Sequence, residues 1–121
     1  MESVSDIVKL ESIKSFQSTI RKSENGLAQM AQKGASTTLI KKRLDAFYIG
    51  LAVLENVWNQ TPHNYIQEDM TEARNTLAGL FPSMENVYAK SKAGSPQRTL
   101  IERRIRALEL AVQAIDYLSK E

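Results

Sequence analysis

The chain has 121 residues, no cysteine and a net charge of +2 at pH 7, with 42% hydrophobic and 25% charged residues. This composition fits a single globular domain, and the lack of cysteine excludes disulfides, thiolate nucleophiles and cysteine-based zinc sites. The sequence shows neither a signal-peptide pattern nor an apolar run long enough to cross a membrane. We therefore expect an intracellular protein without a transmembrane segment.

A first helix is predicted at the start of the chain, because apolar residues recur there at steps of three and four. The hydroxyl of Ser3 or Ser5 can cap its first turn, and Gly34 is suited to end it. Its apolar stripe consists of Ile13, Phe16, Ile20, Leu27 and Met30.

A second helix is predicted to begin after a hydroxyl cap at Ser36, Thr37 or Thr38. Its stripe is the most regular in the chain and reaches the only tryptophan. The stripe consists of Ile40, Leu44, Phe47, Leu51, Leu54 and Trp58.

A third helix is predicted to begin at Thr61-Pro62, a cap residue followed by proline at the first helical position. Pro82 lies inside its stripe, and since the stripe keeps its phase there we expect a kink near Phe81 and no break. The stripe consists of Ile66, Met70, Ala73, Leu77, Leu80, Met84 and Val87.

A fourth helix is predicted after Gly94, which ends the third, and Ser95-Pro96, which repeats the cap-and-proline pattern. Its stripe consists of Ile101, Ile105, Leu108, Val112 and Ile115. No segment alternates with the period of two that is typical of a strand.

An internal repeat organises these helices, since Thr38–Leu54 is matched 61 positions later by Thr99–Ile115. A long repeat of this kind indicates one supersecondary unit used twice. We therefore predict an all-α domain over 1–121, an antiparallel four-helix bundle of two αα-hairpins at about 1–60 and 62–121. The repeat is weaker in the first and third helices, whose stripes drift by one residue.

Basic residues gather at one predicted pole of this bundle. Residues 22–45 and 83–106 hold eleven bases and four acids, a net +7, and the remainder of the chain carries −5. Cations in the first turns of a helix oppose the helix dipole, so their occurrence in both repeats indicates either an anion-facing surface or a solvated end whose charges come with the duplication. The predicted contacts to nucleic acid or another anion are Lys41, Lys42, Arg43, Arg103, Arg104 and Arg106.

Residues suited to catalysis or metal binding are scarce. His63 is the only histidine and is expected to be an ordinary turn residue, and the acidic cluster of Glu68, Asp69 and Glu72 is expected to be a solvated helix face. We predict no catalytic, cofactor-binding or metal-binding residue, and therefore a protein that is not an enzyme.

Apolar residues beside the second stripe widen it, which suits either the broad apolar face of a helix in a globular bundle or the burial of a second surface. The second interpretation predicts an interface with another protein, whereas core or cap packing at the end of the bundle is the first expectation for Trp58. The predicted interface residues are Tyr48, Val53, Val57 and Trp58.

Three motifs within Leu10–Ala93 carry a family resemblance. They read Ile13-Lys14-Ser15-Phe16 through Ile20-Arg21-Lys22, Lys42-Arg43-Leu44 through Leu54-Glu55-Asn56-Val57-Trp58, and Tyr88-Ala89-Lys90-Ser91-Lys92-Ala93. This stretch resembles the helical N-terminal Gag-like region of BEL/Pao-type insect retrotransposon polyproteins. The resemblance implies a structural role in particle assembly through self-association, with nucleic-acid contact as an option. The chain departs from the pattern in lacking a zinc knuckle and in its repeated fourth helix.

The function predicted from the sequence is a non-enzymatic helical module for protein–protein interaction or assembly, which associates with itself. The alternative is a module that binds nucleic acid or another anionic surface through the basic pole.

Overall fold

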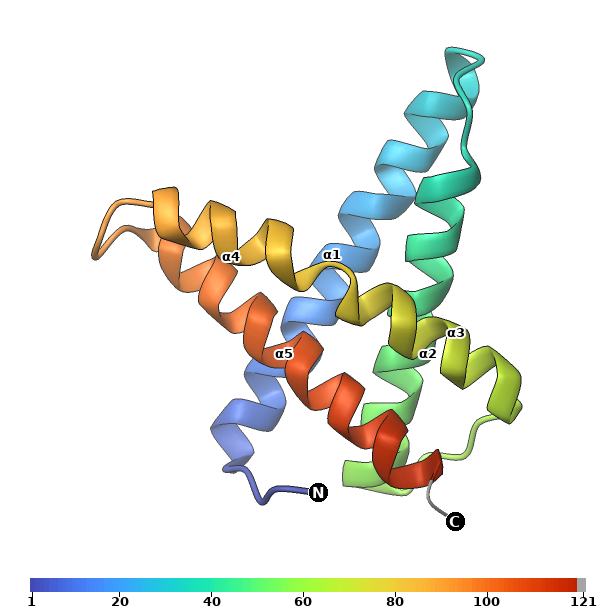
Figure 1. The fold of residues 1–121 in the computed structure, drawn as a ribbon, viewed down its shortest axis with the longest axis vertical. Coiled ribbons are helices and arrows are strands. Elements are labelled where there is room, and N and C mark those ends of the chain that lie inside the picture. The colour runs from blue at the N-terminus through green and yellow to red at the C-terminus, as the bar shows by residue number, and fades with distance from the viewer. Residues whose placement is uncertain (120–121) are drawn as a thin grey trace.

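The structure is a computed structural model that describes residues 1–119 as helices joined by short turns (Figure 1). Residues 120–121, the end of the predicted second hairpin, lie outside this part. The described residues contain no strand, so the all-α prediction is confirmed. The five helices are α1 Asp6–Gln32, α2 Thr38–Asn59, α3 Gln67–Ala78, α4 Phe81–Lys90 and α5 Pro96–Ser119.

Helix ends follow the predicted chemistry at Ser5, Gly34 and Ser95, but the predicted hydroxyl cap of α2 is wrong, since Thr37 makes no side-chain capping hydrogen bond. The hydroxyl oxygen of Ser5 accepts from the N–H of Val8 at 3.2 Å, and that of Ser95 accepts from the N–H of Arg98 at 3.2 Å. Gly34 has a φ of 72°, a left-handed conformation that glycine adopts without strain after a helix. These predicted caps are confirmed, and each depends only on residues close in sequence.

The predicted start of the third helix at Thr61-Pro62 is wrong, because α3 begins at Gln67. The carbonyl of Thr61 accepts from the side-chain amide of Asn56 at 3.0 Å, which holds the loop against the end of α2. His63 lies in this loop as expected, and its Nδ1 accepts from the N–H of Tyr65 at 3.2 Å. A threonine followed by proline also fits an extended loop, since proline fixes only its own φ.

Pro82 breaks the third predicted helix in two, so the expected kink is wrong. α3 ends at Ala78, and Pro82 lies in the first turn of α4, where its missing N–H costs no helical hydrogen bond. A short turn in which Leu80 N–H donates to the carbonyl of Leu77 at 3.1 Å joins the two helices.

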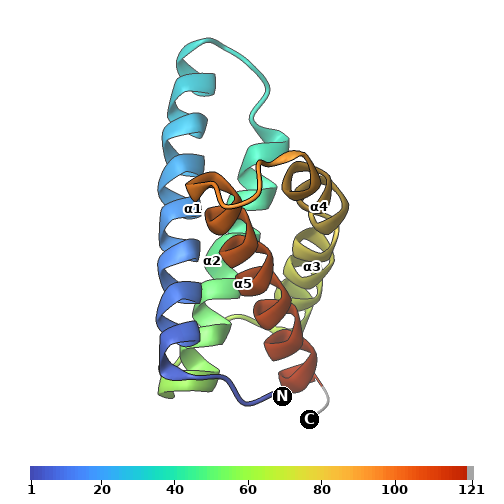
Figure 2. The same ribbon diagram turned by 90° about the vertical axis from the view of Figure 1, so that its left-hand side faces the viewer.

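The helices form two hairpins that cross one another (Figure 1 and Figure 2). α1 and α2 form the first, while α3 and α4 together run back along α5 in the second. α2 and α5 pack against each other, whereas α4 packs mainly on α5. Beyond the crossing the hairpins diverge, and we call the diverging parts, residues 22–45 and 83–106, the two arms. A helical bundle is therefore confirmed, but the turns of the two hairpins do not meet at one pole.

Small side chains allow the close approach at the crossing. A Cβ atom on Gly50 of α2 would lie 2.9 Å from Cε1 of Phe16 on α1 and 3.1 Å from Cδ1 of Leu77 on α3. The matching position in α5 is Ala111, which is fully buried. A larger side chain at position 50 would push α1 and α3 away from α2.

Burial follows the 61-residue repeat at several positions, including one pair of α1 and α3, where the sequence match is weak. At these positions residues 61 apart have nearly equal exposed fractions, both in the core and on the surface. The pairs are Phe16 and Leu77 (2% and 0%), Leu39 and Leu100 (58% and 57%), Ala46 and Ala107 (2% and 1%), and Leu54 and Ile115 (0% and 1%). The two hairpins thus present equivalent faces to one another.

Candidate functional site

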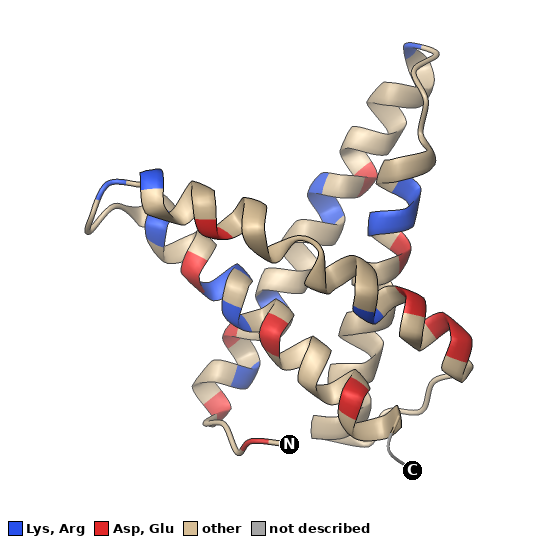
Figure 3. Cartoon of the chain, viewed as in Figure 1, with Lys and Arg blue, Asp and Glu red and all other residues tan. Residues whose placement is uncertain are grey.

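The predicted basic contacts are divided between the two arms, and some are neutralised. Figure 3 shows the basic residues on both diverging hairpins. Nε of Arg103 lies 2.8 Å from a carboxylate oxygen of Glu11, and Arg106 forms two hydrogen bonds with Glu2. These two arginines connect α5 with acidic residues near the start of the chain. The six predicted residues therefore do not form one basic surface.

The predicted interface residues do not form one surface either. Val53 is fully buried in the core, so its assignment to an interface is corrected. Tyr48 is 36% exposed, and its hydroxyl donates to the carboxylate of Glu24. Val57 and Trp58 are half-buried at the far end of α2, in a hollow that Val4 also lines. Sequence periodicity placed Val53 beside the stripe, but α2 is buried on three sides by α1, α3 and α5.

A groove of about 470 Å³ lies between the two arms, and we call it the inter-arm groove. Its apolar part is formed by side chains from α1, α2, α4 and the turn between α3 and α4. The lining residues are Thr19, Lys22, Ser23, Met30, Leu39, Ile40, Arg43, Phe47, Leu80, Met84 and Arg104. Three of them are cations, and no carboxylate of residues 1–119 lines the groove. The groove therefore combines an apolar surface with a positive charge.

The groove lies where the two repeats face each other. Three pairs of its lining residues are 61 positions apart in the chain, one partner in each hairpin. These pairs are Thr19 and Leu80, Ser23 and Met84, and Arg43 and Arg104. Equivalent positions of the two hairpins thus approach the same opening from opposite sides.

Arg104 is the least satisfied cation of the groove. Its Nε atom and the hydroxyl oxygen of Thr19 are buried, and neither has a hydrogen-bond partner within residues 1–119. Burial lowers the pKa of the Arg104 guanidinium, because removal from water disfavours the charged form. A buried donor without a partner costs roughly 1–3 kcal/mol. An acceptor supplied from outside the chain would remove part of that cost.

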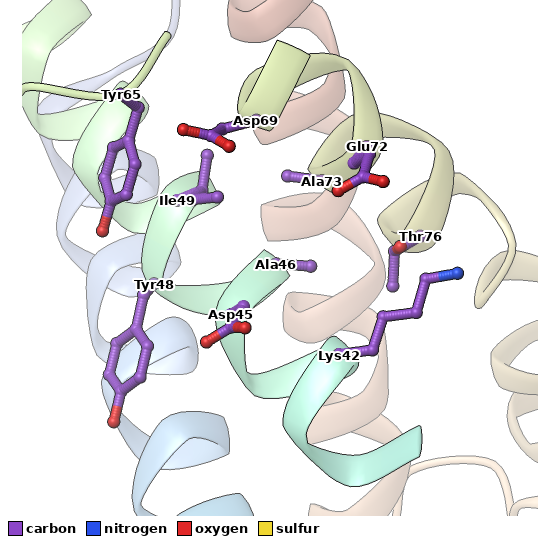
Figure 4. Close-up of a pocket in the computed structure, with 10 residues that line it drawn as sticks. All are labelled: Lys42, Asp45, Ala46, Tyr48, Ile49, Tyr65, Asp69, Glu72, Ala73 and Thr76. Atoms are coloured by element: carbon purple, nitrogen blue, oxygen red, sulfur yellow. The ribbon is translucent and has the colours of Figure 1, made fainter. Parts of the chain in front are cut away.

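A second cavity, of about 270 Å³, lies between α2 and α3 and has the opposite charge (Figure 4). Asp45 from α2 and Glu72 from α3 line it, together with Tyr48, Tyr65 and one cation, the predicted contact residue Lys42, so that acids outnumber bases. Asp69 also lines it, but its carboxylate accepts from the N–H of Ile66 at 3.5 Å and so caps α3. Residues 1–119 contain no cluster of three or more histidine or acidic side chains placed to hold a metal ion.

Sequence reasoning selected Arg43 and Arg104 but missed Lys22 and Thr19. The repeat could have found Thr19, because Thr19 is the counterpart of Leu80 in the third stripe, but it gives no signal for Lys22, whose counterpart is Ser83. The weak sequence match between α1 and α3 hid this relation.

Comparisons with known proteins give no relative. No family model, no curated protein and no solved structure matches the chain. The resemblance to a Gag-like region therefore stays a prediction. None of the five helices of the described part has the length and apolar character of a membrane span.

Proposed function

We propose that the chain is a non-enzymatic interaction module that binds an acidic, amphipathic protein segment in the inter-arm groove. The observation that carries this proposal is the lining of that groove, in which apolar side chains surround three cations and no carboxylate of residues 1–119 takes part. A helix with one apolar face is the usual occupant of an apolar groove between helices.

Charge selects the kind of segment. Lys22, Arg43 and Arg104 would repel a basic segment, and they would pair with carboxylates beside the apolar face of an acidic one. Leu39 and Met84, from opposite arms, offer apolar contacts on both sides of such a segment.

Nucleic acid, the alternative predicted from the sequence, has weaker support. Arg103 and Arg106 are engaged by carboxylates of the same chain, and the remaining cations lie on two separate arms. A duplex contacts cations that follow its backbone, and each neutralised phosphate contributes about −0.9 to the slope of log affinity against log salt.

The test uses two synthetic helical peptides that share a leucine face, one flanked by glutamates and the other by lysines. We expect the acidic peptide to bind the wild-type protein and the basic one to bind at least about tenfold more weakly, since like charges oppose docking. Arg43→Glu should weaken the acidic peptide's affinity by a similar factor, as measured by fluorescence anisotropy.

Lys41→Glu is the matched control, because Lys41 is an exposed cation two residues from Arg43 that does not line the groove. It should leave the affinity nearly unchanged. Equal binding of both peptides, or equal losses in the two variants, would refute the proposal, and a duplex that binds with a steep salt dependence would favour the alternative.

A further inference from the structure

The start of α3 carries an exposed acidic and apolar surface of its own. Ile66 is 59% exposed and Tyr65 37%, and both precede the exposed carboxylates of Glu68 and Glu72. We call these four residues the acidic knob. Figure 3 shows acidic side-chain positions gathered at this end of α3, away from the opening between the arms.

The acidic knob and the inter-arm groove complement each other in chemistry. Glu68 and Glu72 are four residues apart on one helix, so they lie on the same face, about 5–6 Å from each other at Cβ. The groove offers Lys22, Arg43 and Arg104 for these two carboxylates, and its apolar lining suits Tyr65 and Ile66. The knob thus offers both carboxylates and apolar side chains, with Tyr65 and Ile66 in place of an apolar helix face because the apolar stripe of α3 is buried.

We propose that the occupant of the inter-arm groove is the acidic knob of a second copy of this chain. This inference rests on the proposed function and names its partner. The groove and the acidic knob are different surfaces. Each molecule therefore binds one neighbour through its groove and a second neighbour through its knob. Such head-to-tail contacts produce chains or rings of subunits rather than a closed symmetric dimer.

The knob is a small surface compared with the roughly 1,600 Å² buried in a standard stable interface. We therefore expect association to be weak and reversible. Its ion pairs lie at the rim of the groove, so raising the salt concentration should weaken the association.

Two charge-reversal variants separate the surfaces. The groove variant combines Lys22→Glu with Arg43→Glu, and the knob variant combines Glu68→Lys with Glu72→Lys. All four side chains are exposed, so both variants are expected to keep the fold, which circular dichroism verifies. The matched controls are Lys41→Glu and Glu102→Lys, exposed charges outside both surfaces and 61 positions apart.

Sedimentation velocity over a range of concentrations provides the readout. At low salt the wild-type protein should sediment faster as concentration rises, and the two controls should behave in the same way. The groove variant and the knob variant should each sediment as single chains of 13.6 kDa. An equimolar mixture of the two should form a species of about twice that mass, because the intact knob of one enters the intact groove of the other.

Each other outcome overturns the inference. A wild-type protein that stays monomeric at every concentration excludes a second copy as the occupant, and variants that associate like the wild type exclude these surfaces. Loss of association without recovery in the mixture excludes a head-to-tail contact. The acidic peptide's affinity for the groove is measured separately, so the proposed function fails only if that binding also fails.

Discussion

The crossing of the two hairpins and the arms beyond it contrast sharply although the same helices build both. At the crossing, Val53, Leu54 and Leu110 are fully buried, because a neighbouring helix covers every side of them. On the arms, Leu39 and Leu100 are 58% and 57% exposed, and α4 has no buried residue. An apolar side chain on the arms is therefore buried only where a neighbouring helix covers it.

Where the hairpins diverge, the same stripes line an open groove. Stability therefore depends mainly on the residues at the crossing, and the proposed binding depends on the residues of the arms, although the same helices contain both. Substitutions at the crossing should change the free energy of unfolding, and substitutions on the arms should change what the groove binds.

The largest expected effect comes from shortening a buried side chain at the crossing. Leu54→Ala removes a fully buried side chain and should lower the free energy of unfolding by about 2–5 kcal/mol. Leu39→Ala, on the arm of the same helix, should change it by less than about 0.5 kcal/mol. Urea unfolding followed by circular dichroism measures both. Similar losses in the two variants would show that the arms are as tightly packed as the crossing.

A smaller effect is expected where a methyl group is added. Gly50→Ala places a Cβ 2.9 Å from the buried ring of Phe16 and should lower the free energy of unfolding by about 1–3 kcal/mol. Gly26→Ala on the arm meets only the flexible end of Ile40, at 3.2 Å, and should raise it by up to about 1 kcal/mol through helix propensity. The same urea unfolding experiment compares the two. Stabilisation by Gly50→Ala would contradict the close approach at the crossing.

The smallest effect concerns the contact of the chain's first residues with α5. Hydrogen bonds from Arg106 and Gln113 hold the pKa of the exposed Glu2 carboxyl below its ordinary value. Since the folded-state pKa is lowered, this contact is fully present above the ordinary value and is lost as pH falls through the lowered one. Trp58 lines a hollow with the chain's first residues, so its fluorescence should change as that segment detaches in acid.

Glu2→Gln should remove this acid transition in Trp58 fluorescence, because glutamine does not titrate. Glu68→Gln is the control, since Glu68 is an exposed acid on α3, and it should leave the transition in place. A transition that persists unchanged in Glu2→Gln would assign it to another carboxyl group.

The candidate site was predictable in part. Arg43 and Arg104 stand at equivalent places in the repeat, and the charge pattern alone selected both. The role of Arg103 was not predictable, because its partner Glu11 lies 92 positions away and becomes a neighbour only when α1 packs on α5. Lys22 was counted among the bases of the pole, but only the approach of the arms places it in the same groove as Arg104.

The sequence by itself determined the all-α class, the caps at Ser5 and Ser95, and the positions of the 61-residue repeat. These features depend on spacings within a few turns and on single capping residues, so they can be read locally. Only the tertiary structure decided that the hairpins cross, that Val53 is buried and that an open groove separates the arms. The crossing depends on how small and large side chains from distant segments fit together, as Gly50 does with Phe16 and Leu77. No local pattern in the chain contains that fit.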